Sequence, residues 1–326
     1  MGIYVNNTLS PGTKIVQGVT PSGTLSAAIG GVYDVYSYSS LSVDLVDLLD
    51  LRLTTGIPSN TVYTNYDVST VAPGALAGQL GLTEVNLPEV LSIGSSAFLS
   101  CTNLVKADFP KCTSIGYSAF ANCSNLTNIN VPKCEFVSRA AFQYCSNLTS
   151  ISLPVCTKLS DYYNLAYCYK LSAINLPMCN SIGAGYTFYF CGNMVSASLP
   201  LISSLPLYTF CSCSKLVDVS IPACTYVSNY AFQNCWALPS ISFSNIANIG
   251  SSVFGNCFNL LSLYLNVSSV PNLSNINAFI STPISNYTTS TGGVQGSIYV
   301  PTSLYSSFIT ATNWATYSAR IVSMNF

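Results

Sequence analysis

The feature that most constrains the fold is a unit of about 22 residues that recurs nine times between Leu82 and Leu265. Successive units begin 22 or 23 residues apart, each on a leucine or a methionine. The starts are Leu82, Leu104, Leu126, Leu148, Leu171, Met194, Leu216, Leu238 and Leu260. Such regular self-similarity is typical of a solenoid, in which each repeat packs against its neighbours and stacking builds one continuous core.

The first half of each unit predicts a short strand. In the unit that opens at Leu126, apolar Ile129 and Val131 alternate with polar residues, which is the pattern of a half-buried strand. A proline then ends the strand, because it has no N–H to give to a ladder. The prolines are Pro88, Pro110, Pro132, Pro154, Pro177, Pro200 and Pro222. The second half carries Val137, Ala141 and Phe142 before a polar corner and predicts either a second short strand or a single helical turn.

Thirteen of the 14 cysteines fall into two columns that repeat with the unit. The first cysteine column, three residues after an aromatic position, is Cys101, Cys123, Cys145, Cys168, Cys191, Cys213, Cys235 and Cys257. The second cysteine column, after the proline, is Cys112, Cys134, Cys156, Cys179 and Cys224, with Val90, Ile202 and Ile246 at the same position in other units. A position that accepts valine or isoleucine is apolar, so we expect buried, reduced thiols.

Disulfides and metal explain these cysteines less well. Side chains stacked in one column point the same way, whereas a disulfide needs Cβ atoms that face each other. A zinc site is not predicted, because the sequence has neither a CxxC pair nor any histidine that could bind the metal. Cys211 lies outside both columns and is the one candidate for an exposed thiol.

One aromatic column repeats in the second halves of the units. Its members are Phe98, Phe120, Phe142, Phe188, Phe210, Phe232 and Phe254, with Leu165 as the substitute in one unit and Phe279 as a last echo. We expect these rings to stack as a continuous core, because the same position in every coil must meet the same neighbours.

The consensus L-x-x-I-x-L-P-x-C-x-x-I-x-x-x-A-F-x-x-C-x-N resembles the BspA-type leucine-rich repeat of bacterial surface proteins, which is also found in phage-encoded proteins. The resemblance covers about two thirds of the chain. It implies a leucine-rich-repeat-like solenoid that is mainly β, with short helical or irregular second halves. It also implies a scaffold for adhesion or recognition rather than a common reaction, and no catalytic residues.

Four regions are expected along the chain. Residues 1–40 predict a β-rich N-terminal attachment arm, and 41–81 an N-terminal cap, with an amphipathic helix over 41–53, followed by an irregular lead-in. Residues 82–285 form the solenoid. Residues 286–326 predict a loop and a C-terminal cap, with a helix from Ser303 to about Tyr317 and a final strand at Ile321 and Val322. The start of the chain lacks the pattern of a secretory signal, which favours synthesis in the cytoplasm.

The composition excludes several functions. Only 6% of the residues are charged and the net charge is −1, so clustered cations for nucleic acid are missing. The sequence contains no run of 18 or more apolar residues, so it predicts no insertion into a membrane. Without histidine, and without a nucleophile or phosphate-binding motif, the sequence predicts no enzyme, no catalytic residues, no metal and no cofactor.

Two non-enzymatic roles fit these observations. The first is a phage virion component, such as a fibre, decoration or receptor-binding protein, that is made in the host cytoplasm and attached to other virion proteins through its N-terminal region. The alternative is an extracellular bacterial cell-surface adhesin. Either protein would bind a host-surface glycan or protein, and either could be a homo-oligomer.

The two 23-residue units predict the binding patch, because an extra residue must bulge outward if the core keeps its register. Tyrosines accumulate there, and tyrosine offers a large rigid face with a hydroxyl at low entropic cost. The candidate residues are Tyr162, Tyr163, Tyr167, Tyr169, Lys170, Tyr186 and Tyr189. Alternatively, some of these rings only fill the space left by phenylalanine at Leu165. Recognition would then lie on the strand face, at Lys106, Asn128, Ser150 and Asp218.

Overall fold

The structure is a computed structural model that describes residues 60–285 and 294–326. The expected arm over 1–40, the helix over 41–53 and most of the expected loop lie outside the described residues. The chain divides into two units, Met1–Leu153 and Pro154–Phe326. Each unit is a parallel β-solenoid of stacked coils, which confirms the predicted fold class.

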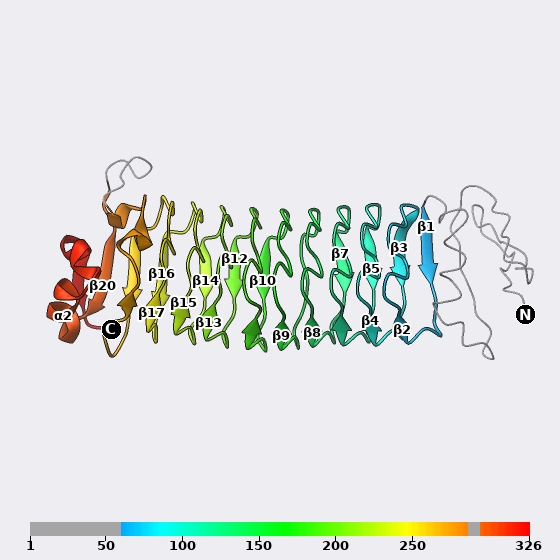
Figure 1. Cartoon of the computed structure of the whole chain (residues 1–326), viewed down its shortest axis with the longest axis horizontal. Helices are drawn as coiled ribbons and strands as arrows, with labels where there is room; N and C mark the ends of the chain where they lie inside the picture. Colours follow the sequence, from blue (N-terminus) through cyan, green and yellow to red (C-terminus); the bar gives the residue numbers. More distant parts are fainter. Residues whose placement is uncertain (1–59, 286–293) are drawn as a thin grey trace, which may run out of the picture. The chain divides into compact units, whose positions relative to one another are not determined.

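The first unit contains two parallel sheets whose strands lie side by side in Figure 1. One sheet has the order β1-β3-β5-β7, formed by Thr61–Thr64, Leu82–Asn86, Lys106–Asp108 and Asn128–Asn130. The other pairs β2, β4, β6 and β8, formed by Thr70–Val71, Ser92–Ile93, Ser114–Ile115 and Phe136–Val137. Each of these coils therefore contributes one longer strand and one two-residue strand. Of the two structures predicted for the second half of the unit, the short strand is confirmed and the helical turn is not.

The second unit repeats this arrangement (Figure 1). Its longer strands are β10 (Ala173–Asn175), β12 (Ser196–Ser198) and β14 (Asp218–Ser220), and then β16 (Ser240–Phe243) and β18 (Ser262–Leu265). Its short strands are β9 (Lys158–Leu159), β11 (Ser181–Ile182), β13 (Ser204–Leu205), β15 (Tyr226–Val227), β17 (Asn248–Ile249) and β19 (Asn272–Leu273). The pairs are parallel and in register, as in Ile174 opposite Ala197 and Ala197 opposite Val219.

The expected irregular lead-in is wrong where the structure describes it, because residues 60–81 form a further regular coil. Strand β1 pairs with β3 and β2 pairs with β4. Leu76 takes the place of the column phenylalanine, and its carbonyl accepts a hydrogen bond from the Cys101 thiol at 2.9 Å. This coil departs from the consensus in residue type but keeps its buried positions, such as Val71 and Leu76.

The aromatic column forms the core of each unit, as predicted. In the first unit Phe120 stacks between Phe98 and Phe142, with ring centroids 4.9 and 5.4 Å apart. In the second unit the stack runs from Phe188 to Phe279 at spacings of 5.2 to 5.5 Å. Each ring is fully buried. These spacings exceed the roughly 4.8 Å between paired strands only slightly, so one ring per coil fills the interior.

All 14 cysteines are buried, which confirms the prediction for both columns and corrects it for Cys211. Cys211 is only 3% exposed, because the equivalent side chains of the adjacent coils cover it. Its sulfur lies 3.7 Å from the Ser212 hydroxyl and 3.9 Å from the Gln233 side-chain oxygen. The spacing of sequence positions alone does not reveal this cover.

The two cysteine columns differ in their hydrogen bonds. A thiol of the first column donates to the carbonyl of the aromatic-column residue in the preceding coil, as Cys235 does to Phe210 at 3.2 Å. A thiol of the second column donates within its own coil, as Cys224 does to Tyr226 at 3.4 Å. The first column thus links one coil to the next, and in the eight coils that contain it no aliphatic residue replaces the cysteine.

This difference predicts unequal responses to valine. Cys235→Val should cost about 1–2 kcal/mol, because it removes the inter-coil hydrogen bond to the buried Phe210 carbonyl, which then keeps only the Cys213 N–H, and it adds a methyl group to a fully packed position. Cys224→Val should cost less than about 1 kcal/mol, since Ile202 and Ile246 occupy the same position in the adjacent coils. Urea unfolding of the two single variants measures both values. Equal losses would contradict the assigned role of the inter-coil hydrogen bond.

The C-terminal region closes the second unit with mixed structure. Two 3-10 turns, η1 (Ile276–Phe279) and η2 (Pro283–Ser285), precede β20 (Ser297–Pro301). The turn η3 (Thr302–Leu304), the helix α2 (Tyr305–Thr310), the 3-10 helix η4 (Trp314–Arg320) and β21 (Ile321–Met324) follow. The final strand is as predicted. The predicted continuous helix over 303–317 is wrong, because α2 ends at Thr310 and Asn313 takes a left-handed φ of 66°.

This break redirects Trp314 into the interior of the cap. Its indole N–H donates to the carbonyl of Pro271 at 2.8 Å, and its ring meets Phe308 edge to face at 5.3 Å. Among the described residues, no helix is long and apolar enough to cross a membrane.

Candidate functional site

The extra residues of the two 23-residue coils lie together on the second unit. Each extra residue falls between the short strand and the aromatic column, in the segments 160–164 and 183–187. The Ala184 N–H donates to the Asp161 carbonyl at 2.7 Å, and Tyr162 forms an isolated bridge with Gly185. Asp161, Tyr162 and Ala184 are exposed. The bulges thus point outward and support each other.

Gly183 is required by this close approach. Its φ is +29°, and a Cβ at this position would lie 1.7 Å from the Asp161 carbonyl oxygen. Any side chain would therefore force the two bulged segments apart. The extra residue of each coil therefore forms a bulge with a defined backbone conformation rather than an irregular loop.

Four tyrosines form a ladder along successive coils next to the bulges. Tyr163, Tyr186, Tyr208 and Tyr230 stack with ring centroids 4.8, 4.7 and 4.7 Å apart. All four have a left-handed φ between 55° and 65°. The equivalent residues of other coils, Ser96, Ser118, Ala140 and Ser252, share this conformation. The backbone therefore sets the left-handed position in every coil but does not select tyrosine for it.

A second group of rings adjoins this tyrosine ladder. Tyr189 meets Tyr186 edge to face at 5.2 Å and Tyr167 at 5.4 Å. Tyr167 stacks on Phe190 at 5.6 Å and meets Tyr169 edge to face at 6.1 Å. Tyr162 completes the set through a contact with Tyr163 at 6.2 Å. We call the whole set of nine rings the tyrosine surface: Tyr162, Tyr163, Tyr167, Tyr169, Tyr186, Tyr189, Phe190, Tyr208 and Tyr230.

The tyrosine surface is open to water and uncharged. Tyr162, Tyr169 and Phe190 are 39–43% exposed, and the other six rings are half-buried. Partial burial, followed by neighbouring groups that include Cys211, raises the pKa of Tyr186 and Tyr189. Both hydroxyls therefore remain protonated donors well above neutral pH. Lys170 is exposed beside Tyr169 and brings a cation to one edge.

Leu165 itself, and none of the tyrosines, occupies the aromatic-column position. Leu165 is fully buried at its place in the aromatic column, whereas Tyr162 and Tyr169 are among the exposed large side chains. The six tyrosines named from the sequence belong to one connected ring cluster. The strand-face alternative is also a column of neighbouring positions, since Lys106 on β5 pairs in register with Asn128 on β7 in the first unit, and Asp218 on β14 pairs with Ser196 in the second. Lys106 also pairs with Glu84 at 3.9 Å.

The repeat identifies the family of the chain. The family described as the BspA type leucine-rich repeat region matches residues 69–185 and 180–295, with six copies. These segments together span more than half of the chain. The chain belongs to the BspA-type leucine-rich repeat family. No curated protein is similar to it at a significant level.

A solved structure from Bacteroides ovatus shares the fold of this BspA-type protein, and two further structures are similar to it in part. A leucine-rich repeat protein from Bacteroides ovatus is 16% identical, covers 100% of this chain and 99% of its own, and superposes with a TM-score of 0.51. The leucine-rich repeat protein of T. pallidum is 22% identical over 55% of this chain and 82% of its own, with a TM-score of 0.45. A leucine-rich cell-surface protein from Faecalibacterium prausnitzii is 18% identical over 100% of this chain and 99% of its own, with a TM-score of 0.41.

Three members of the tyrosine surface of this BspA-type protein were not predicted from the sequence: Phe190, Tyr208 and Tyr230. The signal for two of them was present. Tyr208 and Tyr230 precede a column phenylalanine by two residues, as Tyr186 does. An alignment of the coils by this position finds the whole tyrosine ladder, whereas a search restricted to the two long coils stops at Tyr189.

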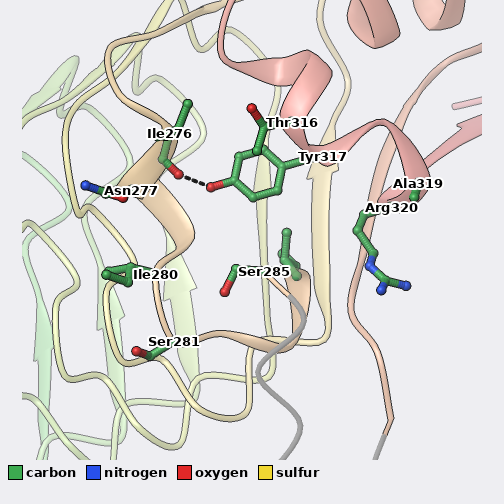
Figure 2. Close-up of a pocket in the computed structure, with 10 residues that line it drawn as sticks. Ile276, Asn277, Ile280, Ser281, Ser285, Thr316, Tyr317, Ala319 and Arg320 are labelled. Atoms are coloured by element: carbon green, nitrogen blue, oxygen red, sulfur yellow. Dashed lines mark hydrogen bonds between the residues drawn. The ribbon is translucent and has the colours of Figure 1, made fainter.

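A cavity at the C-terminal cap of the BspA-type repeat is a second candidate site (Figure 2). It has a volume of about 440 Å³ and lies between η1 and η4. Its lining combines Ile276, Ile280, Tyr317 and Arg320 with small residues. The Tyr317 hydroxyl donates to the Ile276 carbonyl, and Arg320 donates to Gln295. These contacts hold the cap to the last coil, so we assign the cavity to cap packing rather than to ligand binding.

Proposed function

We propose that this protein is a non-enzymatic recognition protein that acts as an adhesin and binds its partner through the tyrosine surface. The observation that carries the proposal is the continuous run of nine exposed or half-buried rings, four of which form the tyrosine ladder at a position where other coils have serine or alanine. An exposed aromatic patch costs hydration free energy and is typical of interaction sites. Tyrosine adds hydroxyl donors and acceptors to that patch without charge.

Family membership favours the adhesin over the virion component. The BspA-type repeat resembles that of bacterial surface proteins, and the solved structures named above come from bacteria. Nothing in these comparisons supports a phage role. The proposal includes no catalysis, because the BspA-type repeat supplies a binding scaffold rather than a common reaction.

Serine variants of the tyrosine ladder test this function. The double variant Tyr186→Ser and Tyr208→Ser should fold, because Ser96, Ser118 and Ser252 occupy the equivalent left-handed positions. Beads coated with the full chain should attach to host cells, and the double variant should reduce attachment about tenfold, as loss of two interface hot spots would. Far-UV circular dichroism and thermal melting verify the fold.

The matched control is Tyr264→Ser. Tyr264 stacks on Tyr299 at 4.8 Å in the strands β18 and β20, away from the tyrosine ladder positions of the coil. This variant also removes one ring of a stacked pair at the surface, so it measures how much attachment falls when aromatic surface is lost outside the tyrosine surface. Full attachment by the double variant, or equal losses in the double variant and the control, would rule out the tyrosine surface as the binding site.

A further inference from the structure

A second column of side chains runs along the second unit at the corner that follows the first cysteine column. Its members are Tyr169, Gly192, Ser214, Trp236 and Phe258. Inter-coil hydrogen bonds keep this corner column in register: the Asn193 N–H donates to the Tyr169 carbonyl, the Ser214 hydroxyl to the Gly192 carbonyl, and the Ala237 N–H to the Ser214 carbonyl. Large aromatic residues thus bound two consecutive small ones.

Trp236 is unusually exposed for its type. Its indole is 51% exposed, whereas Trp314, the other tryptophan of the chain, is 1% exposed. Phe258 of the next coil stacks on Trp236 at 6.4 Å with an interplanar angle of 24°. Because this stack follows the column, the opposite face of the indole is directed toward the coil of Ser214. That coil offers only a small side chain there.

The interruption at Gly192 and Ser214 is open and unstrained. A Cβ at Gly192 would meet one atom within 4 Å, the Ser214 hydroxyl at 3.8 Å, and its φ is not left-handed. Two consecutive positions without a large side chain leave about two coil steps, or roughly 10 Å of the column. Ring faces in contact lie about 3.5–4 Å apart. The interruption therefore has the length for a six-membered ring against Trp236, with Tyr169 at the other end of the column.

The groups beside the interruption are hydrogen-bonding and mostly neutral. Ser212 and Ser214 present hydroxyls, and Asn193 presents an amide. The Lys215 ammonium donates to the Asn193 side-chain oxygen at 2.6 Å, and an ammonium has two further N–H donors. The Ser212 hydroxyl accepts a hydrogen bond from the Asn234 amide at 3.3 Å. Exposed ring faces next to hydroxyl, amide and ammonium groups complement a ligand with apolar C–H faces and a rim of hydroxyls.

We propose that this interruption is a carbohydrate subsite, which holds a pyranose ring of a neutral glycan against the free face of Trp236. The proposal rests on the proposed recognition function and names its ligand class. The axial C–H groups of a pyranose form an apolar face for the indole, and its equatorial hydroxyls reach Ser214, Asn193 and Lys215. The adjoining tyrosine surface would contact the rest of the glycan chain.

Tryptophan fluorescence of the full chain measures binding directly. Acrylamide quenches exposed indoles, so the quenching reports Trp236 and not the buried Trp314. The probes are soluble oligomers of glucose, galactose, mannose, xylose and N-acetylglucosamine. At least one should protect Trp236 from quenching and bind with a Kd in the millimolar range or below. Protection by none of these oligomers overturns the proposal.

Two variants test the geometry. Gly192→Tyr should fill the interruption without strain, since tyrosine already occupies the same column at Tyr169, and should weaken glycan binding at least about tenfold. Trp236→Ala should have the same effect in a binding assay on immobilised glycan, whereas Trp236→Phe should retain affinity within about threefold, because it keeps a ring face. Unchanged affinity in Gly192→Tyr overturns the proposal.

The outcomes separate this subsite from the proposed function. Attachment that is lost in the ladder variant but unchanged in Gly192→Tyr and Trp236→Ala supports the adhesin and rejects the carbohydrate subsite, and a protein or peptide partner would then be indicated. Glycan binding that is lost in Gly192→Tyr, with unchanged cell attachment in the ladder variant, supports the subsite and rejects the tyrosine surface as the adhesive site.

Discussion

Removal of residues 303–326 should make the chain aggregate instead of leaving a slightly shorter folded protein. A solenoid has an open core at its end, and here the cap covers Phe279, the last ring of the aromatic column. Tyr317 meets Phe279 edge to face at 5.2 Å, and Trp314 lies 6.3 Å from it. The deletion would also remove β21 and expose the edge of β20. An exposed core and an exposed strand edge both promote association.

The single variant Trp314→Ala tests the same contact with less disruption. We expect it to destabilise the second unit by about 3–5 kcal/mol, because it leaves a cavity between Phe308 and Phe279. It also leaves the Pro271 carbonyl without its donor. The hydrogen bond from the Tyr317 hydroxyl to the Ile276 carbonyl, drawn in Figure 2, does not involve Trp314 and should persist in this variant. The cap should therefore loosen rather than detach.

Size-exclusion chromatography and thermal melting measure both effects. Tyr305→Ala is the control, since Tyr305 belongs to the same cap but is 36% exposed, and it should change stability by less than about 0.5 kcal/mol. A truncated chain that elutes without aggregates and melts at the full-length temperature would show that residues 303–326 are not a cap.

Alkaline pH should unfold the protein at a lower pH than proteins without buried thiols. Burial raises the pKa of Cys101, Cys112 and Cys224 to about 11 and that of Cys156 and Cys191 to about 12. Below the model-peptide value of 9 the thiols are protonated in both states, and their contribution to stability is fully present. Above it, the unfolded chain loses protons that the folded chain keeps, so stability falls until the folded pKa is reached.

The expected loss is large because the thiols are many. At about pH 10 each of these five thiols should cost about 1 kcal/mol, or about 5 kcal/mol together. This is comparable with the lower end of ordinary folding stability. Circular dichroism between pH 7 and 12 under reducing conditions should therefore show unfolding near pH 10–11.

A variant with fewer thiols serves as the control for alkaline unfolding. Cys112→Val combined with Cys224→Val removes two second-column thiols, and should move the unfolding midpoint to higher pH. Thiolate absorbance recorded in parallel should rise together with unfolding. Thiols that ionise at their ordinary pKa while the fold persists would contradict the buried position of both columns.

Much of the core followed from the sequence, because a fixed period determines the neighbours of each residue. Phe120 must meet Phe98 and Phe142 if every coil has the same shape, and the stack of these rings needs no further information. The same reasoning placed Cys112 and Cys235 in the interior. It also located the bulged coils, since 23 residues cannot fit a 22-residue path without an outward turn.

The parts that failed depend on contacts across different columns, which the period does not specify. Cys211 is buried because its neighbours in adjacent coils cover it, and the helix expected over 303–317 breaks so that Trp314 can reach Phe308. The coil over residues 60–81 escaped notice because Leu76 replaces phenylalanine while the burial pattern persists.

The sequence by itself determined the order of residues within each column of the candidate site. Only the tertiary structure decided which columns adjoin around the coil and which ring faces remain in water. Tyr189 joins the tyrosine ladder because of the way each coil turns at its corners, and the indole of Trp236 stays exposed while that of Trp314 is buried. Those turns arise from left-handed backbone positions that tyrosine, serine, alanine and asparagine all occupy in this chain, so residue type alone cannot reveal them.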